Sequence, residues 1–150
     1  MSNGNKYGEL LTTGGYPPPP IIGLRQFRKK YHGLLYLLYQ HLDYGPLTIK
    51  EWWDLIGADL TEMVGIDKWV NMRRVMSGMS THQRQFVYSF DTYQYGPKKY
   101  IISANGISKL CALGLITNEE AASAKQRLLG VLDGCMDESR LNRILKRTKF

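Results

Sequence analysis

Apolar side chains recur every three or four residues between residues 22 and 44, and this spacing predicts a helix. Its second face is basic and aromatic, with residues such as Arg25 and Tyr39. Tyr44–Gly45–Pro46 ends the predicted helix, because proline cannot continue a helix and disfavours helix in the residue before it. The apolar face comprises Leu24, Phe27, Tyr31, Leu34, Leu35, Leu38 and Leu42.

Four further helices follow from caps and apolar stripes. Thr48 with Glu51, and Thr117 with Glu120, have the spacing of a capping box, in which a hydroxyl and a carboxylate satisfy free amides at a helix start. They predict helices from 48 to about 57 and from 117 to about 132. Residues 60–79 are also predicted to be helical, with a break at Gly65, and 137–149 to form a last helix. The stripe of the 60–79 segment is Ile66, Trp69, Met72, Met76 and Met79.

Residues 80–113 allow two interpretations. Phe86, Tyr88 and Phe90 alternate with other residues at the period of a strand, and Asn105–Gly106 is a hairpin signal. A helix from 98 to 113 also fits, at the cost of an internal glycine. We favour the helix. The predicted fold is therefore all-α, a helical bundle, and the alternative is an α+β fold with a β-hairpin within 86–110.

The N-terminal residues 1–21 are predicted to form an extended arm on a single helical domain, 22–150. This stretch is polar and rich in glycine before the four prolines Pro17, Pro18, Pro19 and Pro20. Consecutive prolines favour a polyproline II rod of roughly 3.1 Å per residue. We expect the arm to become ordered on a neighbouring subunit.

The chain is basic, with 20 Lys and Arg against 13 Asp and Glu and a formal net charge of +7. Such a charge attracts nucleic acid, membrane surfaces or acidic proteins. The basic residues form three groups beside apolar stripes, and several adjustable cations suit a phosphate backbone. The expected DNA-binding residues are Arg25, Arg28, Lys29, Lys30, His32, Lys68, Arg73, Arg74, Arg84, Arg140, Arg143 and Arg147.

The sequence carries little that would support catalysis. The three histidines lack metal-ligand spacing, and no nucleophile elbow, phosphate loop or dinucleotide motif is present. We therefore expect no enzyme, catalytic residue, cofactor or metal site. Cys111 and Cys135 are too few for a disulfide framework, and the sequence does not say whether they pair. The apolar run Gly33–Tyr39 is shorter than the ~20 residues that cross a bilayer, so we expect a soluble protein or subunit.

Several short segments resemble the major coat proteins of archaeal filamentous double-stranded DNA viruses, of the rudivirus and lipothrixvirus kind. The resemblance rests on Leu24–Tyr31 after the arm, the Tyr44–Gly45 turn, the segment Lys68–Arg74, and Leu113–Leu115 followed by two glutamates. Proteins of that kind are small, basic and all-helical, and their dimers wrap A-form DNA inside a helical filament.

The resemblance implies a structural virion protein that coats DNA without sequence preference and assembles in the host cytoplasm. Bases near Arg25 and Arg73 would face DNA. The partner subunit would be a second copy or a paralogous coat protein, and a membrane would be a partner only in an enveloped particle. The expected subunit contacts are Pro17, Pro18, Pro19, Pro20, Leu35, Tyr36 and Tyr39.

Two other functions compete with this interpretation. A viral matrix-type or membrane-surface protein would use its positive charge on anionic lipid and its prolines to recruit a partner. A small nucleic-acid enzyme would need a catalytic group such as Asp54 or Asp59, and both look like exposed helix positions.

Overall fold

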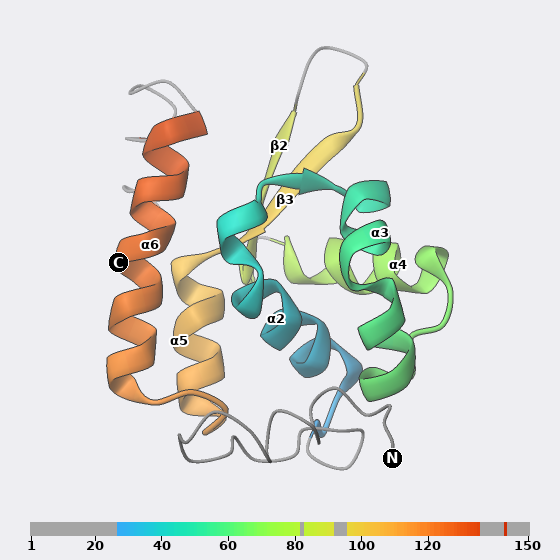
Figure 1. Cartoon of the computed structure of the whole chain (residues 1–150), viewed down its shortest axis with the longest axis horizontal. Helices are drawn as coiled ribbons and strands as arrows, with labels where there is room; N and C mark the ends of the chain where they lie inside the picture. Colours follow the sequence, from blue (N-terminus) through green and yellow to red (C-terminus); the bar gives the residue numbers. More distant parts are fainter. Residues whose placement is uncertain (1–26, 82, 92–95, 136–142, 144–150) are drawn as a thin grey trace, which may run out of the picture.

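The computed structural model describes residues 27–81, 83–91, 96–135 and 143. The predicted arm and all of the predicted last helix except Arg143 lie outside the described residues. The elements in chain order are α2 (Lys30–Gln40), a 3-10 turn η1 (Leu42–Tyr44), β1 (Leu47–Thr48), α3 (Ile49–Asp59), a π-helical turn η2 (Leu60–Val64), α4 (Trp69–Met79), β2 (Val87–Asp91), β3 (Lys98–Ile102), α5 (Ala104–Ala112) and α6 (Asn118–Cys135) (Figure 1).

Helix α2 lies in the middle of the molecule, between the α5–α6 pair and the α3–α4 pair (Figure 1). It contacts α4, η2, α5 and β3. Residues 32–38 are all buried, and Leu34, Leu35, Leu37 and Leu38 have no exposed surface. The predicted two-faced helix is therefore wrong in one respect, because side chains on every side of α2 are covered by the same chain.

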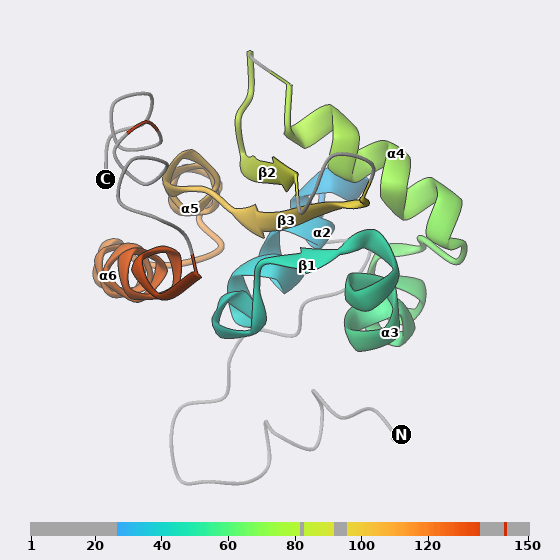
Figure 2. The same ribbon diagram turned by 90° about the horizontal axis from the view of Figure 1, so that it is seen from above.

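The described part of the chain is mostly helical, but the fold is not purely all-α. Three antiparallel strands form a small sheet in the order β1-β3-β2, with Val87 opposite Ile102 and Asp91 opposite Lys98. Seen from above, α3 and α4 lie at one end of the sheet and α5 and α6 at the other (Figure 2). The favoured helix over 98–113 is wrong for its first five residues, which form β3, and the hairpin alternative is right for the strands β2 and β3.

The favoured helix is right for residues 104–112, because Asn105–Gly106, the hairpin signal of the alternative, lies inside α5. Ser103 caps this helix, with its hydroxyl oxygen accepting from the Gly106 amide at 3.0 Å and its hydroxyl donating to the Gln85 carbonyl. A Cβ on Gly106 would lie 2.3 Å from the carbonyl oxygen of Phe86. The glycine is thus needed for the close approach of α5 to the chain before β2, a long-range contact that local turn statistics do not contain.

Both predicted capping boxes are confirmed. The Glu51 amide donates to the Thr48 hydroxyl at 3.2 Å, and the Thr48 amide donates to the Glu51 carboxylate at 2.9 Å. The Thr117 and Glu120 pair repeats this arrangement at the start of α6, at 2.8 and 3.1 Å. The predicted break at Gly65 is also confirmed, because this residue has φ 85° and follows η2 in the left-handed conformation.

Replacing Gly106 by alanine should destabilise the protein by about 1–3 kcal/mol, the usual cost of overpacking a core. A Cβ at Gly130, in contrast, meets nothing within 4 Å on α6, so Gly130→Ala should raise the free energy of unfolding by up to about 1 kcal/mol through helix propensity. Urea unfolding measures the free energy of unfolding of both variants and of the wild type. Equal effects of the two alanines would contradict the close approach described at Phe86.

Candidate nucleic-acid interface

The helices α3 and α4 form a helix-turn-helix unit. The helical stretch α3–η2 ends at Gly65, and residues 65–68 connect it to α4. The Gly65 amide donates to the Leu60 carbonyl at 2.8 Å, and Ile66 is 1% exposed in the core. A four-residue connection that contains glycine is typical of the helix-turn-helix motif.

Helix α4 has one buried and one exposed face. Met72, Met76 and Met79 have no exposed surface, because they pack into the core against α2 and α3. Lys68 at its N-cap, Arg73 and Arg74 are exposed. The structure therefore places these three predicted DNA-binding residues at the surface of the second helix of the unit. Trp69 was predicted to lie on the apolar stripe, but it is 49% exposed.

The hairpin β2–β3 follows α4 directly and is joined to α3. The Trp52 indole donates to the Tyr100 carbonyl oxygen at 2.8 Å in a buried hydrogen bond, which ties α3 to β3. Helix, strand, two helices and two strands thus follow each other as α2, β1, α3, α4, β2 and β3, with the strand order β1-β3-β2. We call the β2–β3 hairpin the wing.

A groove of about 760 Å³ opens between the start of α3, the start of α4 and the start of β3. Trp53 and Trp69 contribute its aromatic walls, and the Arg73 guanidinium lies 5.5 Å from the centre of the Trp69 ring. Exposed Lys50 and Lys98 also line this groove. We call it the wing groove. It combines three cations and one carboxylate, Asp54, with apolar ring surfaces, and this net positive lining suits a phosphate and sugar backbone.

A second cluster of cations and rings surrounds Tyr31 at the start of α2. The Arg84 guanidinium lies 4.9 Å from the Tyr31 ring centre, and the Phe86 ring stacks nearly parallel to Tyr31 at 5.9 Å. The Lys109 ammonium of α5 lies 6.0 Å from the Phe86 ring. The predicted site residues Arg28 and Lys29 are exposed immediately before α2. Three separate stretches of chain therefore contribute to this cluster.

His32 lies beside Tyr31, at 4.4 Å between ring centres, and is only 5% exposed. Burial lowers the pKa of its imidazole, and the charges of Lys109, Lys29 and Arg28 lower it further. The structure thus places His32 in the interior, although it was predicted to contact DNA directly. Lys30 has a different partner, because its ammonium donates to the Gly65 carbonyl at 3.5 Å.

Two of the predicted subunit-contact residues lie in the chain's own core. Leu35 has no exposed surface and Tyr36 is 9% exposed, so neither is presented to a neighbouring subunit, and Tyr39 is half-buried. Burial raises the pKa of both tyrosines. Arg143 is exposed. Other predicted residues lie outside the described part of the chain: Arg25, Arg140, Arg147, Pro17, Pro18, Pro19 and Pro20.

Three cations of these two clusters were missed at the sequence level. Lys50 lies inside the capping box of α3, Lys98 follows the Gly96–Pro97 turn, and Lys109 stands alone on α5. None of them belongs to the three basic groups on which the DNA-binding prediction was based, although Lys98 is followed by Lys99. One signal in the sequence pointed toward the wing. The alternation at 86–90 predicted a strand shortly after the basic helix at 68–74.

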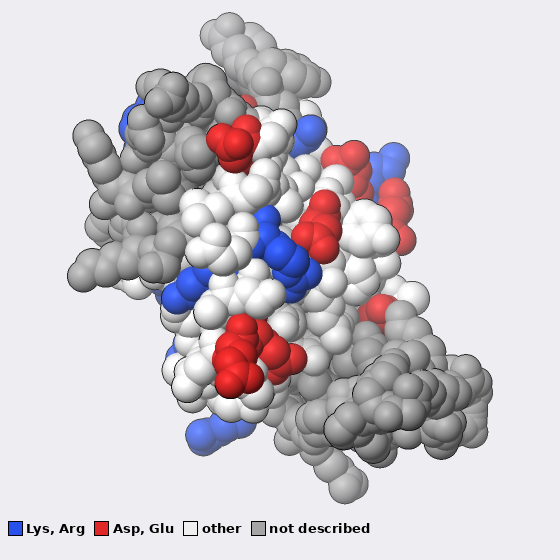
Figure 3. Space-filling model, turned by 60° about the vertical axis from the view of Figure 1, so that its left-hand side comes forward, with Lys and Arg blue, Asp and Glu red and all other residues white. Residues whose placement is uncertain are grey.

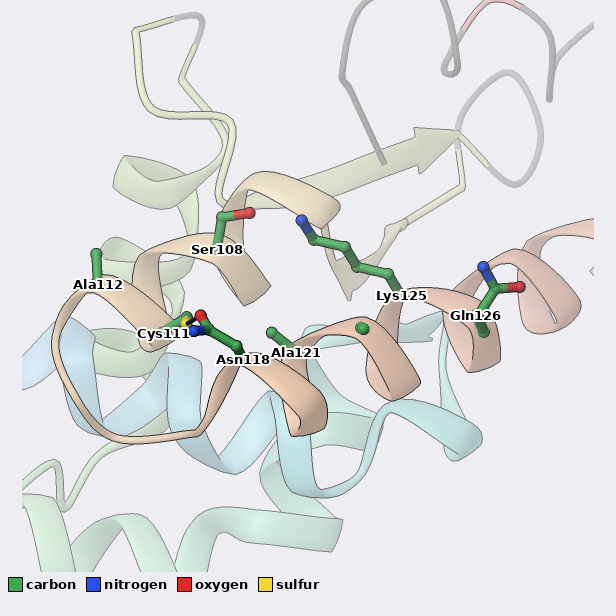
Figure 4. A pocket seen from close by; sticks show the side chains of 8 residues that line it. Ser108, Cys111, Ala112, Asn118, Ala121, Lys125 and Gln126 are labelled. Carbon is green, nitrogen blue, oxygen red and sulfur yellow. Dashed lines mark hydrogen bonds between the residues drawn. The ribbon is translucent and has the colours of Figure 1, made fainter.

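The α5–α6 side of the molecule offers a different kind of surface. Acidic and basic side chains lie next to one another on this face (Figure 3), where α6 carries Glu119, Glu120 and Arg127. A hollow between the two helices is lined by small and polar side chains (Figure 4), and within it the Cys111 thiol lies 2.9 Å from the Asn118 amide oxygen. Cys111 and Cys135 are both unpaired thiols. Mixed charge makes this face a poor platform for a polyanion.

Within the described ranges, no group of three or more His, Cys, Asp or Glu side chains could hold a metal ion. None of the helices in that part of the chain is long and apolar enough to cross a membrane. Comparisons with protein-family models, with curated proteins and with solved structures find no match to this chain.

Protonation of His32 should destabilise the fold. Its pKa in the folded protein is lower than the usual 6.5, so the unfolded chain binds the proton more tightly. The stabilising contribution is complete above pH 6.5 and is lost as the pH falls through 6.5 toward the folded-state pKa. Urea unfolding between pH 7.5 and 5.0 measures this loss.

The variant His32→Phe, which keeps a ring against Tyr31, is the control for that experiment. It should lose much less stability than the wild type between pH 7.5 and 5.0. The Glu51 carboxylate does not interfere, because its pKa lies below the usual 4.5 through its hydrogen bonds to Thr48. The same pH dependence in both proteins would show that other groups are responsible.

Proposed function

We propose that this protein binds duplex DNA through α4 and the β2–β3 wing, without catalysing a reaction. The observation that carries the proposal is a helix-turn-helix unit whose second helix exposes Arg73 and Arg74, directly followed by an antiparallel hairpin. In helix-turn-helix proteins the second helix enters the major groove, and residues near its N-terminus contact base edges. Fold alone does not establish function, so the proposal rests equally on these side chains.

The chemistry of the exposed side chains fits the parts of a duplex. Arginine can donate two parallel hydrogen bonds to a guanine edge or to a phosphate, so Arg73 and Arg74 suit either contact. Lys50 lies in the first turn of α3, where the helix dipole also favours a phosphate. Lys98, at the start of β3, suits the backbone on the other side of the wing groove.

This proposal keeps duplex DNA as the partner expected from the sequence. It assigns the contact to α4, which would enter the major groove of the DNA. The coat-protein resemblance, in contrast, implied that all-helical subunits wrap around the DNA. Assembly into a virion filament, and pairing with itself or with a paralogous subunit, stay predictions. A matrix-type or membrane-surface role also stays a prediction, with no observation of the described residues favouring it.

Arg73→Ala should weaken binding to a preferred duplex by about 5- to 150-fold, the effect of about 1–3 kcal/mol that is typical of a base-reading arginine. Lys98→Ala should weaken binding to all duplexes alike and reduce the slope of log K against log salt by about 1. Fluorescence anisotropy with labelled duplexes selected from a random pool, repeated at several salt concentrations, measures both effects.

Lys125→Ala is the matched control, because it removes one positive charge from α6, which lies at the other end of the sheet from α3 and α4. It should change affinity far less than Arg73→Ala. Since Arg73 and Lys98 are exposed, both variants should fold, and circular dichroism checks this. Wild-type affinity in Arg73→Ala, or equal losses in all three variants, would refute docking by α4.

A further inference from the structure

We propose that the cluster around Tyr31 is a second binding site for the phosphate backbone of duplex DNA. We define the Tyr31 surface as Arg28, Lys29, Arg84 and Lys109, together with the rings of Tyr31 and Phe86. The inference rests on the proposed function, because that function makes DNA the partner. It adds a contact that uses none of the residues lining the wing groove.

The rings hold two of the cations in place. Arg84 lies over Tyr31, Tyr31 stacks on Phe86, and Lys109 lies near Phe86, so cations and rings alternate across the surface. A cation over an aromatic face is attracted by about 0.5–1 kcal/mol at exposed sites. Restricting a long side chain before binding lowers the entropy that it loses on contacting a phosphate.

Three of the cations also affect the same buried side chain, the His32 imidazole. Lys109, Lys29 and Arg28 come from α5 and from the chain before α2, and all three lower the pKa of the buried His32 imidazole. Their positive potentials therefore overlap at a single point of the fold. A phosphate bound among these exposed cations would be attracted by each of them, and it would offset their effect on the buried imidazole.

The two sites lie on different elements. The wing groove is formed by α3, α4 and β3, whereas the Tyr31 surface is formed by the start of α2, residues 84–86 and α5. The two surfaces could contact the same duplex at separate positions or hold two duplexes together. In both cases each occupied phosphate adds about 0.9 to the slope of log K against log salt.

The test compares two double variants with equal loss of charge. Arg28→Gln with Lys29→Gln should reduce the salt slope of DNA binding by about 1.8, for two phosphates. The control pair Lys125→Gln with Arg127→Gln, on α6, should reduce it much less, since these residues lie outside both sites. Equal reductions in the two pairs would overturn the second site, because total charge would then be the cause.

His32 provides an independent readout of where the DNA lies. In wild-type protein, NMR titration of the imidazole should show its pKa rising when duplex DNA is added, as a phosphate offsets the nearby cations. The rise should be lost in the Arg28 and Lys29 double variant and kept in Arg73→Ala at saturating DNA. An unchanged His32 pKa in wild-type protein with bound DNA would overturn the proposal.

These variants also separate this inference from the proposed function. Normal binding by Arg73→Ala, with a reduced slope in the Arg28 and Lys29 variant, would refute α4 docking and leave the second site standing. The reverse pattern would refute only the second site. Stoichiometry on a duplex of about 30 base pairs, about three helical turns, then distinguishes the two arrangements. Two such duplexes per chain indicate bridging, and one per chain with a steeper salt slope indicates a shared duplex.

Discussion

The burial of α2 on every side is the constraint on which the rest of the structure depends. Four of its leucines are fully buried, and such a side chain contributes about 1.5–3 kcal/mol when removed from water. The turn η2 approaches α2 so closely that a Cβ on Gly33 would lie 2.5 Å from a methyl carbon of Val64. Since α4, η2, α5 and β3 all pack on this helix, it sets where each of them lies.

The two candidate surfaces follow from that arrangement. With Met72, Met76 and Met79 buried in the core, Arg73 and Arg74 lie on the exposed face of α4. The hydrogen bond from Trp52 to the Tyr100 carbonyl then holds β3 against α3, so that the wing stands beside the helix-turn-helix unit. At the other site, Tyr31 in the first turn of α2 lies under the Arg84 guanidinium. Lys109 of α5 lies near the Phe86 ring, which stacks on Tyr31.

Local signals predicted the parts of the fold that local interactions determine. The capping boxes of α3 and α6 and the break at Gly65 each need only residues a few positions apart, and all three were predictable. The covering of α2 was not, because an apolar face looks the same whether the same chain or a neighbour packs on it. The favoured helix was right at Asn105–Gly106, but the reason for a glycine inside α5, the close approach of the distant Phe86 carbonyl, was not predictable.

Local sequence signals also did not predict which basic residues lie together in the fold. Arg73 and Arg84 were both predicted to bind DNA, but the fold separates them, with Arg73 over Trp69 and Arg84 over Tyr31. Lysines outside the predicted groups complete both clusters, because Lys98 lines the groove with Arg73 and Lys109 lies near Phe86. Charge runs thus predicted an anionic partner, whereas tertiary packing decides which cations can act on one phosphate together. That packing turns a generally basic chain into one with two defined clusters of cations and aromatic rings, the surfaces that we propose for DNA.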